Sequence, residues 1–348
     1  MQDSTRATPW EDLPFATATL PGIGGRLKAL PEDFIVEEIP EVEPSGTGEH
    51  LFVWVEKSGI DTPTAQRAIA EHLGLNPDSI SYAGLKDSQA ITKQYICLPA
   101  KYESALSTFQ DERVIIHSSK RHSHKLKRGM LRGNRFRVLL RDSSSDAATL
   151  LASFKNHFDA KGFPNYFGPQ RFGTHGQTLA RGLKYLDDSK DLSRTKRLTS
   201  FQRLALCSVQ SMIFNEWLAQ RIRDDLADTF LEGDLISHRR TGILKWVQSP
   251  GDIDSSVWVP TGPLPGGKMR MPRGAARARE VALGDSLGLE VQNLENFERQ
   301  LSGDRRPAFT VVKDFEYAVS DVGALLDFTL EPGCYATAFL REVMKRSF

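Results

Sequence analysis

The order of strand-like and helix-like segments constrains the fold of this 348-residue chain more than any other feature of its sequence. Runs typical of β-strands fall between residues 34 and 141 and again after residue 306, whereas long helical patterns fill residues 178–223. Strands at both ends of the chain, with helices between them, favour one domain inserted into another over two domains that follow each other along the chain. The chain is long enough for two such domains.

The N-terminal block is predicted to form a mixed arrangement of strands and helices. Asp61 is a helix N-cap candidate, a proline follows in the first turn, and the helix should end at Gly74. Residues 134–141 alternate apolar side chains with Arg135 and Arg137, so one face can join a core while the other presents guanidinium groups. Further strands are expected at residues 34–39, 50–56, 94–98, 114–117, 309–312 and 326–330, and helices at 145–162, 178–186, 201–223 and 337–346.

The charges of the chain are segregated, although their sum is only +1. Residues 113–141 contain ten Lys and Arg and no acid, and residues 268–279 contain five basic residues and no acid. Two such clusters on a nearly neutral protein indicate a surface for a polyanion, since Lys and Arg that meet phosphates release condensed counterions. The alternative is a basic surface that is only solvated and binds no partner, and we consider this alternative stronger for residues 268–279 than for residues 113–141.

Several classes of protein are disfavoured. No apolar run approaches about 18 residues, so we expect no membrane span, and the polar residues 1–14 lead us to expect a cytoplasmic protein. His122 and His124 lie among cations that repel a metal ion, so no metal site is expected. Residues 262–268 have the spacing of a phosphate-binding loop, but Met269 replaces the required Ser or Thr, which argues against a nucleotide cofactor.

Asp87 lies beside Lys86 in a glycine-containing loop between two strand-like runs. Taken alone, such an aspartate is ordinary turn chemistry, because its side chain can bond the local backbone. Residues 164–173 are dense in aromatic and turn-forming residues, and we interpret them as a structural hinge, with base stacking as the alternative.

Five motifs, in the same order along the chain, resemble the tRNA pseudouridine synthase D (TruD) family. They are Pro31-Glu32-Asp33-Phe34, Ala83-Gly84-Leu85-Lys86-Asp87, Gly133-Asn134-Arg135-Phe136, residues 164–173, and Pro332-Gly333-Cys334-Tyr335-Ala336-Thr337 followed by Arg341-Glu342. The resemblance implies an α+β fold: a mixed-sheet pseudouridine synthase domain flanked by helices (residues 1–158 and 306–348), interrupted by an inserted, family-specific α/β domain, the TRUD domain (159–305). The two are expected to form a V-shaped architecture with RNA in the cleft between them.

The resemblance further implies conversion of uridine to pseudouridine at tRNA position 13, without cofactor or metal. Asp87 falls on the family's catalytic position, where it could attack C1′ or the pyrimidine ring, or remove a ribose proton. Arg341 is carried over as its basic partner. The residues expected to hold the substrate are Phe34, Lys86, Asn134, Phe136, Tyr335 and Arg341. For Phe136, core packing is an equal alternative, because it belongs to an alternating strand.

Two rival functions remain. A non-catalytic protein that binds or remodels tRNA would use the same basic clusters, but this function does not explain the carboxylate of Asp87. A carboxylate-dependent hydrolase of small substrates is disfavoured, because the sequence shows no second acid at motif spacing. We expect a monomer that acts on tRNA, with other structured RNAs as further substrates left open.

Overall fold

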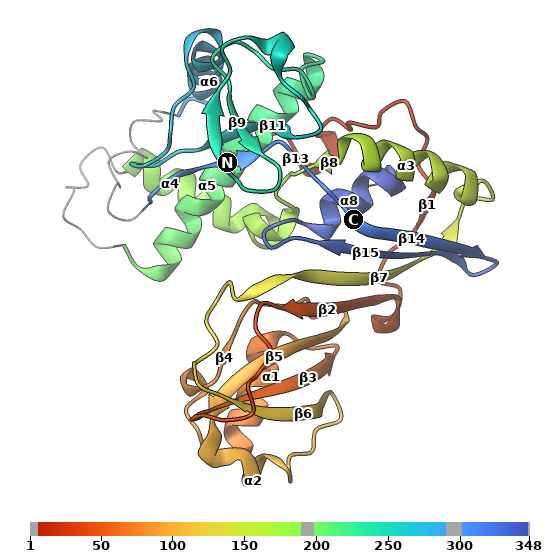
Figure 1. Cartoon of the computed structure of the whole chain (residues 1–348), viewed down its shortest axis with the longest axis vertical. Coiled ribbons are helices and arrows are strands. Elements are labelled where there is room, and N and C mark those ends of the chain that lie inside the picture. Colours follow the sequence, from red (N-terminus) through yellow and green to blue (C-terminus); the bar gives the residue numbers. More distant parts are fainter. Residues whose placement is uncertain (1–5, 189–197, 290–300, 347–348) are drawn as a thin grey trace. The chain divides into compact units, whose positions relative to one another are not determined.

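The computed structural model describes residues 6–188, 198–289 and 301–346, and the chain divides into two compact units (Figure 1). The first, here called the sheet unit, comprises residues 22–155 and 312–333. The second, the helical unit, comprises residues 1–21, 156–311 and 334–347. The expected interruption of one unit by another along the chain is present, and the mixed α+β class is confirmed.

Among the described residues, the sheet unit is built on a nine-stranded mixed sheet with the path β14-β15-β7-β2-β5-β3-β6. Strands β2 and β5 run parallel, and the other neighbours are antiparallel. Two short strands lie off this path, β1 on β7 and β4 on β5. The bounds are β1 Gly24–Arg26, β2 Phe34–Pro40, β3 His50–Ser58, β4 Ser81–Tyr82, β5 Ile91–Pro99, β6 Val114–His122, β7 Leu131–Ser143, β14 Lys313–Ser320 and β15 Gly323–Leu330.

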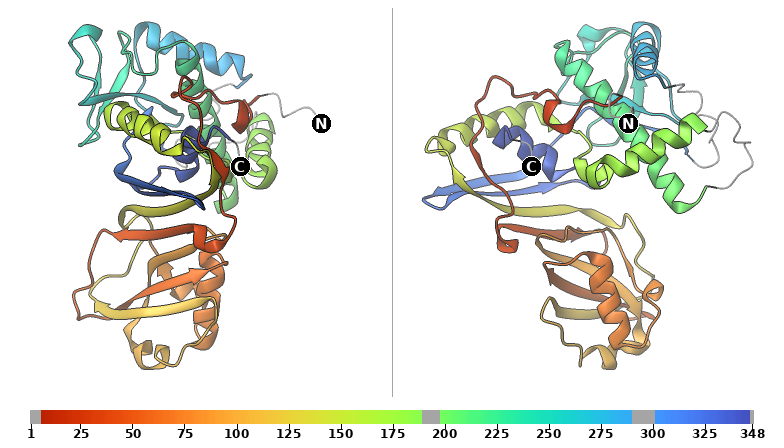
Figure 2. Two further views of the ribbon diagram at one scale, coloured as in Figure 1. Left: turned by 90° about the vertical axis from the view of Figure 1, so that its right-hand side faces the viewer. Right: turned by 180° about the vertical axis from the view of Figure 1, so that it is seen from behind.

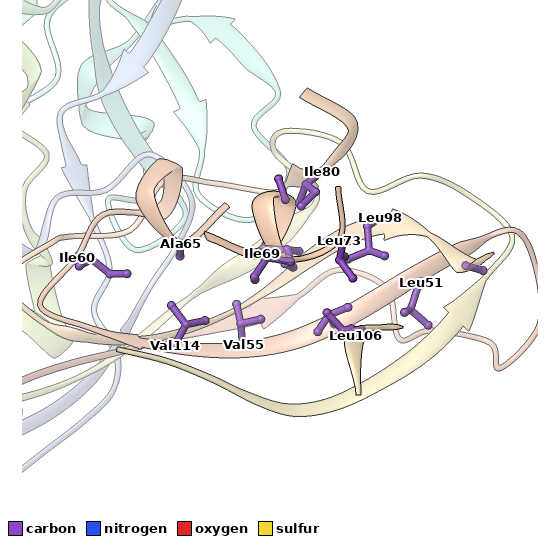
Figure 3. Packing of buried hydrophobic residues seen from close by; sticks show 14 residues of the cluster. Leu51, Val55, Ile60, Ala65, Ile69, Leu73, Ile80, Leu98, Leu106 and Val114 are labelled. Carbon is purple, nitrogen blue, oxygen red and sulfur yellow. The ribbon is translucent and has the colours of Figure 1, made fainter. Parts of the chain in front are cut away.

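Helix α1 (Thr62–His72) covers one face of β3 and β5 (Figure 2). Its start follows the predicted cap, because the Asp61 side chain accepts a hydrogen bond from the Thr64 N–H at 2.8 Å. Ile69 of the helix packs with Val53 and Ile96 of the strands in a buried cluster, and Figure 3 shows part of this packing. The cluster fixes α1 against the strand that follows the Asp87 loop.

Strand β7 confirms the predicted alternation. Phe136, Val138 and Leu140 are buried, whereas Arg135 and Arg137 are exposed. The buried face continues onto β2 and β15 through the register pairs Val36↔Phe136 and Phe328↔Phe136. One apolar stripe therefore crosses three neighbouring strands.

The helical unit is organised around α5 (Ser200–Arg223), which begins with a capping box between Thr199 and Gln202. The middle of α5 is buried on all sides, more than the one apolar stripe that its sequence predicts. Among the described residues, a four-stranded sheet, β10-β9-β11-β12, packs beside it. A Cβ on Gly262 of β11 would lie 2.4 Å from the Trp217 ring. The bounds are β9 Leu235–His238, β10 Leu244–Trp246, β11 Trp258–Leu264, β12 Asp304–Pro307, α4 Gln177–Asp188 and α6 Gly274–Ser286.

The C-terminal helix α8 (Ala336–Met344) belongs to the helical unit. Its Phe339 ring lies 5.2 Å from Phe158 and 5.4 Å from Phe163, and Glu342 accepts hydrogen bonds from the backbone of Ala16 and Thr17. These contacts tie both ends of the chain to residues after 155, whereas the predicted boundaries assign the ends to the catalytic domain. The predicted boundaries stay a prediction, and their residues 1–5, 189–197, 290–300 and 347–348 lie outside the described residues.

Four further helices and strands belong to the described chain. Helix α3 spans Ala147–Lys161, α2 spans Glu103–Leu106, and the short strands β8 (Phe163–Pro164) and β13 (Phe309–Thr310) pair antiparallel. In the segment at residues 164–173, Tyr166 and Phe167 are buried and Phe172 is half-buried, and the interpretation of this segment as a hinge stays a prediction. None of the described helices is both long and apolar enough to cross a membrane.

Candidate active site

The loop that carries Asp87 joins β4 to β5 in the sheet unit, and neighbouring side chains hold its backbone. The Lys86 N–H donates to Thr62 Oγ1 at 3.0 Å, and Gln94 Nε2 donates to the Gly84 carbonyl at 3.0 Å. Thr62 Oγ1 in turn donates to Gln94 Oε1 at 2.9 Å, which links the first turn of α1 to β5. The loop is therefore fixed from two sides, by the helix and by the strand.

Lys57 of β3 also supports this loop. Its ammonium donates to the Asp87 carbonyl oxygen at 2.6 Å and to the Ile60 carbonyl oxygen at 2.7 Å. The residue is 1% exposed. Burial lowers the pKa of Lys57 to about 8, although the nearby Asp87 charge acts in the opposite direction. A buried cation thus fixes the backbone of Asp87 and leaves its carboxylate for other partners.

The Asp87 carboxylate is 38% exposed, and Lys28 is its ion-pair partner within the sheet unit. Lys28 Nζ lies 3.5 Å from Asp87 Oδ1 and 4.2 Å from the centroid of the Phe34 ring. The backbone of Lys28 has φ +54°, a left-handed conformation that is uncommon for a residue with a side chain. Lys28 therefore joins the carboxylate to an aromatic ring that the motifs predict for the same site.

Lys86 does not extend into solvent. Its ammonium donates to Glu38 Oε2 at 2.8 Å, and both side chains are almost fully buried. Glu38 Oε1 also accepts from the Tyr95 N–H at 3.3 Å. This pair anchors the loop to β2, and the predicted contact between Lys86 and substrate stays a prediction.

An aromatic row lies on the buried face of the sheet. The Phe34 and Phe136 rings meet edge to face at 6.1 Å, and Phe136 stacks on Phe328 at 5.2 Å with an interplanar angle of 15°. All three rings are buried. Of the two roles considered for Phe136, these contacts support core packing, and a nucleotide contact stays a prediction.

Asn134 precedes Phe136 on β7 and lies opposite Glu38 of β2. Its side-chain oxygen is buried and accepts no hydrogen bond from the described residues. The Thr92 hydroxyl, on β5, is in the same condition. Buried polar atoms without a partner are uncommon in folded proteins, which makes both atoms candidates for bonding to a ligand.

Tyr335 and Arg341 belong to the helical unit. The Tyr335 ring contacts Phe167 edge to face at 5.7 Å, and burial raises the pKa of its phenol. The Arg341 guanidinium stacks 3.8 Å from the Phe15 centroid and donates to the carbonyls of Glu11 and Leu13. Burial lowers the pKa of Arg341. These contacts favour a structural role for Arg341, so its pairing with Asp87 stays a prediction, whereas Lys28 is the cation that the structure places beside Asp87.

The sequence motifs include neither Lys28 nor Lys57. Lys28 precedes β2 in a segment that contains no motif. Lys57 follows the apolar residues of β3, and its position in the sequence indicates only that the strand ends there. A lysine that directly continues a strand buried on both faces is unusual, and this was the one signal that could have found Lys57. Within the described ranges, no cluster of three His, Cys, Asp or Glu side chains could hold a metal ion.

Comparison with known proteins assigns the chain to one family of RNA-modifying enzymes by name. The family described as "tRNA pseudouridine synthase D (TruD)" matches residues 13–188 and 183–343. A protein named tRNA pseudouridine synthase D from Thermus thermophilus is 37% identical over 339 residues, which cover 96% of this chain and 93% of that protein. A protein of the same name from an Anaeromyxobacter species is 37% identical, with 96% of both chains covered.

A crystal structure titled as the putative tRNA pseudouridine synthase D from Methanosarcina mazei resembles the chain in fold. The TM-score is 0.77 with 24% identity, and 99% of each chain is covered. The chain belongs to the tRNA pseudouridine synthase D (TruD) family. The resemblance seen in the five sequence motifs is thereby confirmed.

Proposed function

We propose that the protein is a tRNA pseudouridine synthase that isomerises uridine at tRNA position 13, with Asp87 as the catalytic residue. One observation carries the proposal: an exposed carboxylate, paired with Lys28, on a loop whose backbone is fixed by Lys57 and Thr62. Membership of the family and the names of its relatives supply the reaction.

The reaction moves one bond within a nucleotide. The bond between N1 and C1′ breaks, a bond between C5 and C1′ forms, C5 loses its proton to solvent, and N1 gains one. Lys28 Nζ lies 3.5 Å from Asp87 Oδ1 and can hold the carboxylate in one orientation. An ionised carboxylate can attack C1′ or the ring as a nucleophile, or accept a ribose proton, and the fixed loop holds it ready for each route.

Other residues of the site suit an extruded uracil. The target base must leave the RNA stack to be reached. The unpartnered Asn134 oxygen can accept a hydrogen bond from the imide N–H of uracil, and Phe34 supplies an aromatic ring. The substrate contact of Tyr335, which belongs to the helical unit, stays a prediction from its motif. The RNA itself would be attracted by the exposed cations of the first basic run, residues 113–141.

The rival function, tRNA binding without chemistry, is separated by one substitution. Purified protein is incubated with unmodified tRNA, and the product is mapped for pseudouridine. The wild type should form it, and Asp87→Asn should form none at an unchanged affinity for tRNA. Product from the Asp87→Asn variant would remove Asp87 from catalysis, and tRNA binding by a wild type that forms no product would establish the rival.

A further inference from the structure

The second acid-free basic run, residues 268–279, lies in the helical unit and continues into α6 (Figure 1). The guanidinium carbons of Arg270 and Arg273 lie 4.3 and 4.0 Å from the centroid of the Trp246 ring. Trp246 ends β10, and its indole N–H donates to the Met271 carbonyl at 3.0 Å. Two arginines therefore stack on one indole, which is itself hydrogen-bonded to the segment between them.

Further bonds fix this arrangement. Arg270 donates to the Leu244 carbonyl at 3.1 Å, and the Arg273 N–H donates to the Gly233 carbonyl at 2.9 Å. Arg277 lies in the first turn of α6, where its N–H donates to the Arg273 carbonyl at 3.2 Å. The arrangement therefore depends on the bonds of Arg270 and Met271 to β10 and of Arg273 to Gly233, which precedes β9.

The charges of this segment are not neutralised by neighbouring acids. Across the described residues, no carboxylate oxygen lies within 4.0 Å of a charged nitrogen of Lys268, Arg270, Arg273 or Arg277, and all four residues are exposed. Arg279, by contrast, is paired with Asp224. Four arginines of the first run are likewise paired with carboxylates. The four cations of the second run therefore concentrate positive charge without compensation.

Stacking on an indole has a specific effect on an arginine. It orients the planar guanidinium and leaves the N–H donors at the edge of the plane, which suits bonding to phosphate oxygens. An ordered side chain also loses less conformational entropy when it binds. Because two guanidinium groups already occupy the Trp246 ring, the ligand is expected to meet the cations and not to stack on the indole.

We propose that Lys268, Arg270, Arg273 and Arg277, of which Arg270 and Arg273 are ordered by Trp246, form a second contact surface for the phosphate backbone of the RNA substrate. We call it the Trp246 surface. The inference rests on the proposed function only in taking RNA as the partner. It adds a binding surface in the helical unit to the site around Asp87, and its contacts are independent of base sequence.

The test uses the full-length variant Arg270→Gln/Arg273→Gln, because glutamine keeps a planar group on the indole and removes the charge. The affinity for an unmodified tRNA is measured by fluorescence anisotropy over a range of NaCl concentrations. The slope of log K against log salt is negative, and each phosphate that a cation no longer neutralises lowers its magnitude by about 0.7 to 0.9. The double variant should therefore lower this magnitude by about 1.4 to 1.8. The control Arg279→Gln removes a cation that Asp224 already neutralises, and it should change the slope by less than half as much.

An unchanged slope in the double variant overturns the proposal, as does an equal change in Arg279→Gln. If the double variant does not fold, Arg277→Gln takes its place with an expected fall of about 0.7 to 0.9, and an unchanged slope there overturns it equally. Binding to anionic phospholipid vesicles that disappears in the variant, with the tRNA slope intact, would assign the surface to a membrane and overturn the proposal. Pseudouridine formed by the wild type alongside an unchanged slope would refute this surface alone, whereas a reduced slope without any pseudouridine would refute the activity alone.

Discussion

Lys57 offers a prediction in which stability and catalysis can be separated. Its pKa is lowered from 10.5 to about 8 by burial, so between these two pH values the unfolded chain binds a proton that the folded protein does not. The free energy of unfolding therefore rises with pH across this window, by about 3 kcal/mol in total and by about 2 to 3 kcal/mol between pH 7 and pH 10. The neutral amine still has N–H donors for the Asp87 and Ile60 carbonyls, so the loop keeps its bonds.

The variant Lys57→Met removes this titration. At pH 7 it relieves the cost of a buried charge but leaves two buried carbonyls without a donor, at about 1 to 3 kcal/mol each, so its net stability should change little. By pH 10 the wild type should have gained about 2 to 3 kcal/mol over the variant. The kcat should fall at every pH, because the backbone of Asp87 loses its tether.

Urea denaturation of the wild type and of Lys57→Met at pH 7 and pH 10 gives the free energy of unfolding of each. Subtracting one free energy from the other at each pH removes the contribution of groups that titrate in both proteins. Lys101→Met, which removes an exposed lysine from the same unit, controls for the removal of a lysine as such. If the free energies of unfolding of the wild type and of Lys57→Met differ by the same amount at both pH values, the proposed titration of Lys57 is refuted. An unchanged kcat would refute its role in holding Asp87.

Three further outcomes are expected. Lys28→Met should change stability by less than about 1 kcal/mol, because its ion pair is partly exposed, yet lower kcat/KM by about tenfold or more, with partial rescue by Lys28→Arg. Gly162→Ala should destabilise the protein in urea by about 2 kcal/mol or more, because φ is +76° and a Cβ would lie 2.3 Å from the Thr310 carbonyl oxygen. Gly176→Ala, at φ +73° with nothing within 4 Å, should show only the conformational part, about 1 kcal/mol. Weaker tRNA binding with a flatter salt dependence is expected when alanine replaces Lys125, Lys127 and Arg128.

The sequence predicted elements whose signals are local. The alternation in β7 is visible because one face is buried and the other is not, and the start of α1 is visible because Asp61 caps it. Strands β9, β10 and β11 of the β10-β9-β11-β12 sheet were not predicted from the sequence. Strands β9 and β10 are short, and β11 contains Pro260 and Pro263, which disfavour a strand prediction. Strand β14 was missed although Phe315, Tyr317 and Val319 alternate along it, because the strand lies at the sheet edge and most of its residues are exposed.

The sequence motifs include only part of the candidate site. Asp87, Phe34 and Asn134 stand in recognisable stretches, and the structure gives each of them surroundings that fit the proposed roles. Lys28 could not be predicted, because an ion pair between distant segments leaves no local pattern. Arg341 shows the converse: its motif is recognisable, but its guanidinium is used to hold residues 11–15 in the helical unit.

The most direct test of the central claim is to follow a single atom. Because C5 exchanges its hydrogen for C1′, a tRNA transcript made with [5-³H]uridine should release tritium into water as the wild type acts. One equivalent per tRNA is expected, with the new pseudouridine mapped to position 13 and none released by Asp87→Asn or from a transcript with cytidine at that position. Tritium released by Asp87→Asn at the wild-type rate would contradict the catalytic role of Asp87, and no release by the wild type from tRNA that it binds would contradict the proposed activity.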